Sequence, residues 1–399
     1  MNLAIITIVY PPLSSSGAEL VRDLAKGFVV AGHVPYIFFP DSSIEQDLKI
    51  EEDDGVVVLR FRCPETRDKS YFIRSLNEFL MPYRIWMKFI RSDACNVKLD
   101  YVVCYSPSIF FTPLIKRLKS RYSCRSYLIV RDIFPDWAVD LGLIRKNSFI
   151  HRIFSWVQSS QYRVSDVIGV QSEGNLSCIG GEVKKAGKKL EVLNNWLTPY
   201  DSPNCSIDLK NTKLAGKIIF VYAGNMGIAQ GMKILISLAV KFANRDDVGF
   251  LFVGRGSEVE KLKLTAKDCY LKNILFLPEI PSTEIAALYK QCHVGLLCLD
   301  RRHKSHNIPG KFVTYMYSGL PVLAALNPGN DLSKIISEHD VGMSIEDDCV
   351  DSLKISADKL LLKLSDDEIE KRCINMAVKM FSTQSIVEQI LRADNPHRC

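Results

Sequence analysis

Three loops in the second half of the chain combine glycines with groups that could bind a phosphate. They are Gly224-Asn225-Met226-Gly227, Gly254-Arg255-Gly256 and Pro309-Gly310-Lys311. Glycine lets the backbone approach an anion closely because no Cβ intervenes. The first turn of a helix supplies free N–H groups and a positive dipole end, to which Lys311 adds a full charge. Together the three loops predict a site for a phosphorylated ligand in this half of the chain.

The helix expected from Gly310 onward has a predicted buried stripe of Phe312, Tyr315 and Met316, which are spaced i, i+3, i+4. Thr314 lies off this stripe, so its hydroxyl could face a ligand. Spacing alone slightly favours a different interpretation, an ordinary surface helix that begins after a proline.

The first half has one comparable loop, residues 11–19, in which Gly17 opens a helix after the first predicted strand. Two such loops follow strands in the second half, so we expect the nucleotide there. Asp132, which is followed by Asp136, lies just beyond another predicted strand and could orient an acceptor hydroxyl. Asp132 could instead be an N-cap or turn carboxylate. Neither the G-x-G-x-x-G pattern nor a P-loop occurs.

Short apolar runs alternate with helical stretches along the whole chain, which predicts an α/β fold with parallel sheets. The strands expected are listed by residue number: 3–9, 35–39, 56–61, 101–105, 127–130, 167–170, 190–193, 217–223, 249–253, 274–277, 294–299 and 321–325. Residues 198–204 read as a linker. We therefore expect an N-terminal domain over 1–200, a C-terminal domain over 205–380, and a last helix within 381–399 that could belong to either.

The composition fits a globular protein, with 399 residues, 47% apolar residues and 24% charged ones. No apolar run approaches the roughly 18 to 20 residues of a membrane span. The N-terminus reads as a strand and not as a signal peptide. Twelve cysteines without a C-x-x-C pair predict core thiols and a reducing, cytoplasmic environment.

Residues 71–91 place an aromatic and aliphatic stripe beside Arg74, Arg84, Lys88 and Arg91. Such a stripe flanked by cations is typical of a helix at an anionic membrane surface. A core-packing helix with solvated arginines would have the same pattern. A second basic cluster at residues 116–121 favours the membrane, specifically the inner face of the cytoplasmic membrane. Nucleic acid is not expected as a partner, because no recognised binding module accompanies the charge.

Several motifs resemble the GT-B glycosyltransferases of family 4 when they are taken in order. These are "RDIFPDWAVDLGLI", "VLNNWL", "YAGNMGIAQGM", "FVGRGSE", "FLPEIPSTEIAALYKQCHVGLLCL" and "IPGKFVTYMYSGLPVLA". The series covers nearly the whole chain. It is most similar to the bacterial polysaccharide branch that includes the N-acetyl-L-fucosaminyl transferases of O-antigen (lipopolysaccharide) assembly.

The resemblance implies two Rossmann-like domains that face a cleft, with acceptor binding in the first and nucleotide-sugar binding in the second. It implies retaining transfer of a hexosamine-type sugar, such as L-FucNAc, from a UDP-sugar to an undecaprenyl-diphosphate-linked glycan, with no metal and no other cofactor. By resemblance, the donor would meet Gly17, Gly224, Asn225, Gly227, Gln230, Glu279, Ile280, Gly310 and Thr314. Lys311 and Arg255 would stabilise the departing diphosphate, and Asp132 would orient the acceptor.

The chain departs from the family pattern at four positions. His306 and Thr314 stand where many members carry two glutamates, Gln230 replaces a lysine, and Arg131 replaces a histidine beside Asp132. These departures leave two alternatives, a GT-B-type sugar-nucleotide epimerase or a partner subunit that binds donor without transferring it. His303 and His306 have metal-ligand spacing but lack an evident third ligand.

Overall fold

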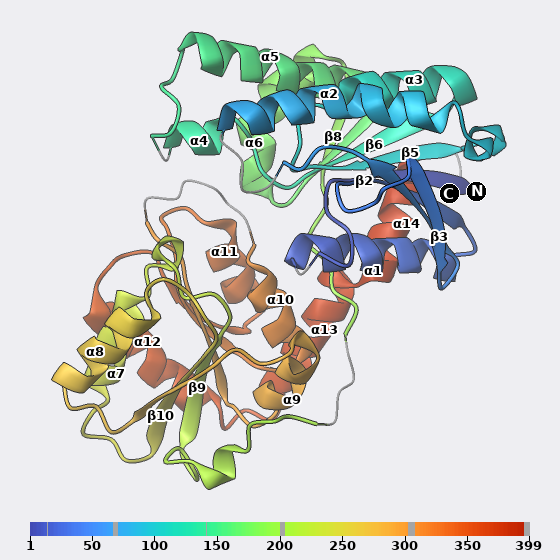
Figure 1. Ribbon diagram of the computed structural model, residues 1–399. Helices are drawn as coiled ribbons and strands as arrows, with labels where there is room; N and C mark the ends of the chain where they lie inside the picture. Colours follow the sequence, from blue (N-terminus) through green and yellow to red (C-terminus); the bar gives the residue numbers. More distant parts are fainter. Residues whose placement is uncertain (14, 67–70, 141, 200–203, 302–307, 395–399) are drawn as a thin grey trace. The chain divides into compact units, whose positions relative to one another are not determined.

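The computed structural model describes residues 1–399 except 14, 67–70, 141, 200–203, 302–307 and 395–399 (Figure 1). The chain divides into two compact units. Unit 1 comprises Met1–Trp196 together with Thr383–Cys399, and unit 2 comprises Leu197–Ser382. The chain thus passes from one unit to the other near residues 196 and 382, whereas the sequence suggested changes near 200 and 380.

Unit 1 contains an eight-stranded sheet in the order β3-β4-β2-β1-β5-β6-β7-β8, in which only β3 is antiparallel to its neighbour. Its strands are β1 Asn2–Ile6, β2 Val34–Asp41, β3 Leu48–Asp53, β4 Val56–Arg62, β5 Tyr101–Tyr105, β6 Arg125–Val130, β7 Val167–Val170 and β8 Lys189–Val192. Its α-helices are α1 Ser16–Val30, α2 Tyr71–Phe89, α3 Thr112–Tyr122, α4 Asp136–Asp140, α5 Phe149–Val164, α6 Glu173–Lys185 and α14 Thr383–Asp394.

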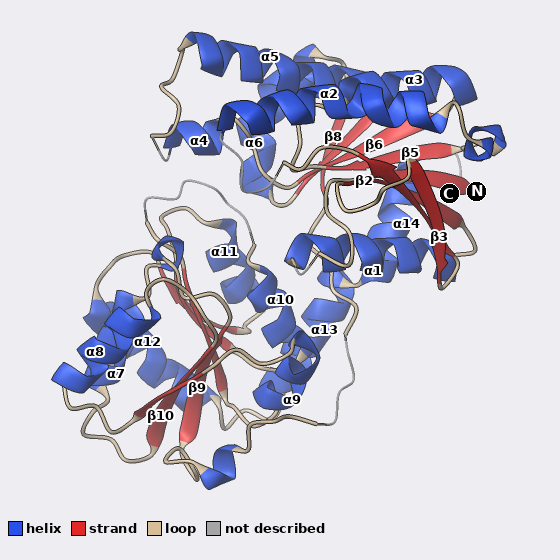
Figure 2. Cartoon of the chain, in the orientation of Figure 1, coloured by secondary structure: helices blue, strands red, loops and turns tan. Residues whose placement is uncertain are grey.

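Successive residues of each buried strand face opposite sides of this sheet, so both faces are apolar and both are covered. Leu3 and Ile5 pack with α1 and α14, while Ala4 and Ile6 pack with α2, α3 and α6. The sheet therefore lies between two helical layers, which Figure 2 shows in blue around the red strands. Gly27 of α1 leaves room for α14, since a Cβ there would lie 2.7 Å from Thr383 Cγ2.

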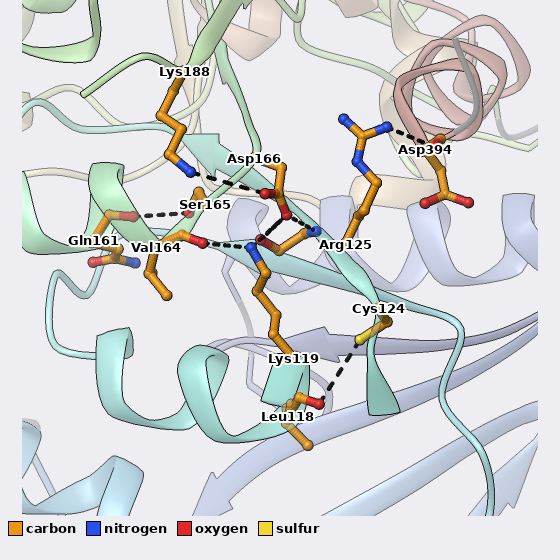
Figure 3. A network of polar contacts seen from close by, with 11 residues as sticks. Leu118, Lys119, Cys124, Arg125, Gln161, Val164, Ser165, Asp166, Lys188 and Asp394 are labelled. Carbon is orange, nitrogen blue, oxygen red and sulfur yellow. Dashed lines mark hydrogen bonds and ion pairs between the residues drawn. The ribbon is translucent and has the colours of Figure 1, made fainter. Parts of the chain in front are cut away.

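A polar network at the amino-terminal end of β6 and β7 fixes the helices that cover this sheet (Figure 3). Lys119 of α3 donates to Asp166 Oδ2 at 2.5 Å and to the carbonyl of Val164 at the end of α5 at 2.8 Å. Partial burial raises the pKa of Asp166, but hydrogen bonds from Lys119 and Ser126 outweigh it and hold that pKa below its usual value. The network therefore joins α3 and α5 as neighbours.

Unit 2 contains a six-stranded, fully parallel sheet in the order β11-β10-β9-β12-β13-β14. Its strands are β9 Ile218–Ala223, β10 Val248–Val253, β11 Ile274–Leu277, β12 Val294–Cys298, β13 Val322–Ala325 and β14 Gly342–Ile345. Its α-helices are α7 Lys233–Lys241, α8 Val259–Asp268, α9 Ile285–Tyr289, α10 Gly310–Tyr317, α11 Asp331–Glu338, α12 Val350–Lys363 and α13 Ile369–Phe381. The strand order reverses between β9 and β12, and ligands of such sheets bind at the carboxyl ends of strands at this point.

The predicted strands are confirmed to within a few residues, and two strands were missed. These are β3, an antiparallel edge strand, and β14, a four-residue edge strand. The helix indicated by the pattern of residues 71–91 is α2, which ends at Phe89 and continues through Pro82. Within the described part of the chain, no helix is both long enough and apolar enough to cross a bilayer.

Candidate active site

The first two glycine loops of unit 2 lie in direct backbone contact at the carboxyl edge of the sheet. A Cβ on Gly254 would lie 2.1 Å from the carbonyl oxygen of Gly224, and a Cβ on Gly256 would lie 2.4 Å from that of Met226. The Met226 N–H donates to the Arg255 carbonyl at 2.7 Å. Gly224 and Gly254 have φ values of +128° and +142°, which glycine adopts far more readily than other residues. The loops therefore form one surface.

The third loop reaches the same place through Lys311. The Lys311 Nζ lies 3.7 Å from the centre of the Tyr222 ring and 3.6 Å from where a Cβ on Gly224 would lie. Lys311 makes no ion pair with any carboxylate among the described residues. Burial lowers the pKa of Lys311 from 10.5 to about 8. A cation held over an aromatic face without a counter-ion, at the strand-order reversal, is suited to receive an anion.

Arg255 and Glu279 form an ion pair beyond these loops, with 3.1 Å between Nε and Oε2. Both side chains are largely exposed, so the pair itself adds little stability. Ile280 is half-buried and packs against the core under α9 and α10. The pair connects the segment expected to meet the base with the loop expected to meet the phosphates.

Two of the side chains that were expected to meet the donor make hydrogen bonds within their own segments. Gln230 Oε1 accepts a hydrogen bond from the Gly227 N–H at 3.0 Å, closing that loop. The Thr314 hydroxyl donates to the carbonyl of Gly310, one turn earlier in α10, at 3.3 Å. Gly310 and Asn225 are exposed, and a Cβ on Gly310 would meet no protein atom within 4 Å.

The segment that follows β12 carries further cations and the two histidines with metal-ligand spacing. Arg301 lies 3.3 Å from Asp348, an ion pair at the start of α12. Arg302, His303, Lys304 and His306 lie outside the described residues. Across the described ranges, no group of three or more His, Cys, Asp or Glu side chains is arranged to hold a metal ion.

Asp132 lies at a pocket in unit 1, between β6 and α4. The pocket has a volume of about 200 Å³. Its lining is aromatic with a few polar groups: Arg74, Ser75, Glu78, Pro107, Ile109, Phe110, Asp132, Phe134, Trp137 and Phe154. Desolvation by the surrounding protein raises the pKa of Asp132, and the nearby Arg131 charge opposes that rise. Asp132 precedes α4 by four residues and is not the N-cap of that helix.

Arg131 is a buried guanidinium in the same loop. It lies over the Trp196 ring, 4.6 Å from its centre, and its Nε donates to the Tyr105 hydroxyl at 3.4 Å. Its Nη2 donates to Asn195 Oδ1, whereas Nη1 has no hydrogen-bond partner among the described residues. A Cβ on Gly17 would lie 3.7 Å from the Tyr105 hydroxyl, so Gly17 and Arg131 lie near one another.

Sequence reasoning missed Tyr222, the aromatic pocket lining and the buried position of Arg131. Tyr222 gave no signal beyond its place in a buried strand, where an aromatic residue normally fills a core. The pocket residues come from α2, the loop after β5, the loop after β6, α4 and α5, so no local spacing could have grouped them. Arg131 was noticed only as a departure from the family pattern.

Residues 207–380 match the family described as "Glycosyl transferases group 1". "Probable glycosyltransferase WbjE" of Pseudomonas aeruginosa is 27% identical over 227 residues, which are 54% of this chain and 54% of that protein. The chain thus spans about half the length of this curated relative.

Solved structures match over nearly the full length at low identity. The sucrose-phosphate synthase of Thermosynechococcus elongatus has a TM-score of 0.73 and 13% identity, covering 98% of this chain and 97% of that one. The lipopolysaccharide outer core galactosyltransferase WaaB has a TM-score of 0.61 and 12% identity, covering 98% and 99%. The chain therefore has the α/β GT-B fold, and its residues 207–380 are similar to the group 1 glycosyltransferases.

Proposed function

We propose that this protein is a retaining glycosyltransferase that moves a sugar from a nucleotide-sugar to a lipid-linked oligosaccharide. The observation that carries the proposal is the contact of Lys311 with Tyr222 and Gly224. A half-buried ammonium group that has no carboxylate partner among the described residues is unfavourable unless an anion neutralises it, and a diphosphate would do so. The name of the WbjE relative and the family match of residues 207–380 support transfer as the reaction.

In this reaction the bond between the anomeric carbon and the diphosphate oxygen breaks while a bond to the acceptor oxygen forms on the same face. The acceptor proton passes to the departing diphosphate, and the free nucleotide leaves. Lys311 stabilises the negative charge that grows on the leaving oxygen. Asp132 orients the acceptor hydroxyl from unit 1, because its raised pKa and aromatic surroundings suit a carboxylate that makes a hydrogen bond.

The finer assignment is a UDP-sugar donor, with an N-acetylated deoxyhexosamine such as L-FucNAc, and an acceptor on undecaprenyl diphosphate. The motif resemblance to O-antigen transferases supports it, as does the likeness in fold to WaaB, which is named for lipopolysaccharide outer core synthesis. The role is then surface-polysaccharide assembly at the inner face of the cytoplasmic membrane. The finer assignment involves neither a metal nor another cofactor.

The first test is a thermal-shift screen of nucleotides and nucleotide-sugars, because a ligand that binds the folded state raises the midpoint of unfolding. We expect UDP and UDP-sugars to raise it and Lys311→Ala to weaken UDP binding by at least about tenfold. The exposed Lys261→Ala on α8 serves as the matched control. Equal UDP affinity in the wild type and Lys311→Ala would contradict the placement of the diphosphate.

The second test separates the alternatives by their products. The protein is incubated with a UDP-sugar and lipid-linked GlcNAc. A longer lipid-linked glycan identifies a transferase, an isomerised donor identifies an epimerase, and unchanged reactants with intact UDP binding identify a non-catalytic subunit.

A further inference from the structure

Unit 1 exposes a concentration of large apolar side chains on three of its helices. Among the described residues, half of the exposed large hydrophobic side chains fall between residues 73 and 156. On α2 they are Ile73, Leu76, Phe79, Tyr83 and Met87, on α4 Trp137, and on and before α5 Leu143, Phe149, Ile150, Ile153 and Trp156. Phe149 is 78% exposed and Trp156 66%. Apolar groups gathered in this way mark an interaction surface.

The exposed groups of α5 follow i, i+1, i+4, i+7 spacing, so they share one side of the helix. The opposite side packs inward through Gln158, Gln161 and Tyr162. The α2 residues follow one another at intervals of three to four and likewise form a single stripe. Each helix is thus amphipathic with an apolar outer face, the reverse of an ordinary surface helix.

A chain of aromatic contacts connects α2 to α5 and α4. Phe79 contacts Phe110, with ring centres 6.3 Å apart, and Phe110 contacts Phe154 at 6.4 Å. Phe154 contacts Phe134 at 4.9 Å, and Phe134 contacts Trp137 at 5.8 Å. Phe110, Phe134, Trp137 and Phe154 also line the pocket at Asp132. The two exposed stripes are therefore continuous with that pocket.

The charge of this helical layer indicates which kind of partner the surface binds. Helices α2, α3 and α5 form one layer over the sheet (Figure 1), and together they carry nine Lys or Arg and one acid, the buried Glu78. Arg74, Lys88 and Lys119 pair with carboxylates. The other six form no ion pair with a described carboxylate: Arg84, Lys116, Arg117, Arg121, Arg152 and Arg163. Apolar groups beside unpaired cations fit an anionic lipid surface.

We propose that α2 and α5 form one docking surface that inserts its apolar side chains into an anionic lipid bilayer, with the aromatic pocket opening onto the bilayer. The inference rests on the proposed function, since it lets a lipid-linked acceptor reach Asp132 without leaving the membrane. It adds α5, whose Phe149 and Trp156 are more exposed than Phe79 and Tyr83 of α2, to the surface expected from residues 71–91.

The test uses the full chain and vesicles of phosphatidylethanolamine and phosphatidylglycerol in a 70:30 ratio, with pure phosphatidylcholine vesicles for comparison. We expect the wild type to co-sediment with the anionic vesicles and to dissociate as salt increases, since salt screens the lipid charge. Phe149→Ser combined with Trp156→Ser should weaken this binding at least about tenfold. Tyr270→Ser combined with Leu362→Ser, which removes exposed apolar groups of unit 2, should leave it unchanged.

A second readout reports insertion directly. Fluorescence emission should shift to the blue with anionic vesicles, and Trp156→Phe should remove most of that shift. Equal binding by the two double variants, or no binding by the wild type, would overturn the proposal. So would a wild-type dimer that Phe149→Ser with Trp156→Ser converts to a monomer, because the face would then bind a second copy of the chain.

Failure of this inference is distinguishable from failure of the proposed function. Vesicle binding requires neither donor nor turnover, and a UDP-induced thermal shift confirms that each variant is folded. Transfer to a water-soluble acceptor without vesicle binding would overturn only the docking surface. Vesicle binding without any transfer would overturn only the proposed function.

Discussion

Lys311 keeps a positive charge in surroundings that disfavour it. The difference between its ordinary pKa of 10.5 and about 8 corresponds to roughly 3 kcal/mol against the charged form. The Tyr222 ring offsets about 1 kcal/mol of this. The folded pKa lies below the unfolded one, so the penalty is complete below about pH 8 and fades as pH rises towards 10.5.

Lys311→Met should therefore stabilise the ligand-free protein at pH 7, by about 1–2 kcal/mol, while abolishing most UDP-induced stabilisation. Thermal unfolding with and without UDP measures both effects. Lys261→Met, on the exposed part of α8, is the control and should change neither. A lower unfolding midpoint for Lys311→Met would show that the lysine is satisfied by the protein itself.

UDP affinity should fall as pH rises through about 8, because the neutral amine no longer attracts the diphosphate. If protonated Lys311 is required, the dissociation constant rises by up to about tenfold per pH unit above the pKa. Calorimetry between pH 7 and 9.5 measures this slope. Lys311→Ala should show no such slope, and a slope shared by both proteins would assign the titration to another group.

At this scale the sequence predicted positions better than contacts. Gly224 and Lys311 were expected near one another because both lie in loops that the sequence predicts to bind a phosphorylated ligand. Their partner Tyr222 was not expected, nor was the ion pair of Arg255 with Glu279. Thr314 was expected to face a ligand, but its hydroxyl bonds back to Gly310, a local alternative that hydroxyl side chains often take in helices.

At the scale of elements, the paired loops after β9 and β10 depend on glycines with no room for a side chain. Gly254→Ala should cost on the order of 3 kcal/mol, because its Cβ would overlap the Gly224 carbonyl and φ is positive. It should also weaken UDP binding by displacing Gly224. Urea denaturation and calorimetry measure the two effects.

Gly181→Ala is the matched control for that substitution. Gly181 lies in α6, where a Cβ would meet nothing within 4 Å. Alanine favours a helix, so this variant should be neutral or slightly more stable. An unfolding midpoint for Gly254→Ala equal to that of the wild type would be incompatible with the close contact of the loops.

Strands could be predicted where burial dictated composition. β5, β7 and β11 match their predicted ranges residue for residue, because continuous apolar runs mark strands covered on both faces. β3 was missed because an exposed antiparallel edge tolerates the polar sequence LKIEED. β14 was missed because four residues at an edge give too short a pattern.

At the scale of the whole molecule, the contact of α14 with α1 holds two distant parts of the chain in one unit. Gly27→Val should wedge these helices apart, because its Cβ would lie 2.7 Å and 2.9 Å from Thr383 and Val387 methyl carbons. We expect a loss of roughly 1–3 kcal/mol and faster proteolysis near residue 383. Val30→Ala, at a residue 89% exposed on the same helix, should change stability by less than about 0.5 kcal/mol.

The two-unit organisation was readable from the restart of the strand pattern after residue 217, but the place of the last helix was not. Its apolar stripe would suit a face of either sheet. Close packing against Gly27 and the hydrogen bonds of Gln389 to Glu191 and Val192 identify the partner, and such contacts between distant segments have no counterpart in local sequence.

The return of α14 to unit 1 has a consequence for biosynthesis. Ile386, Val387 and Ile390 belong to the same core cluster as α1, yet the ribosome makes them only after all of unit 2. The part of unit 1 that is synthesised first therefore keeps the apolar surface for α14 uncovered until unit 2 has been translated. This delay makes the emerging chain a natural client for chaperones that shield apolar surface.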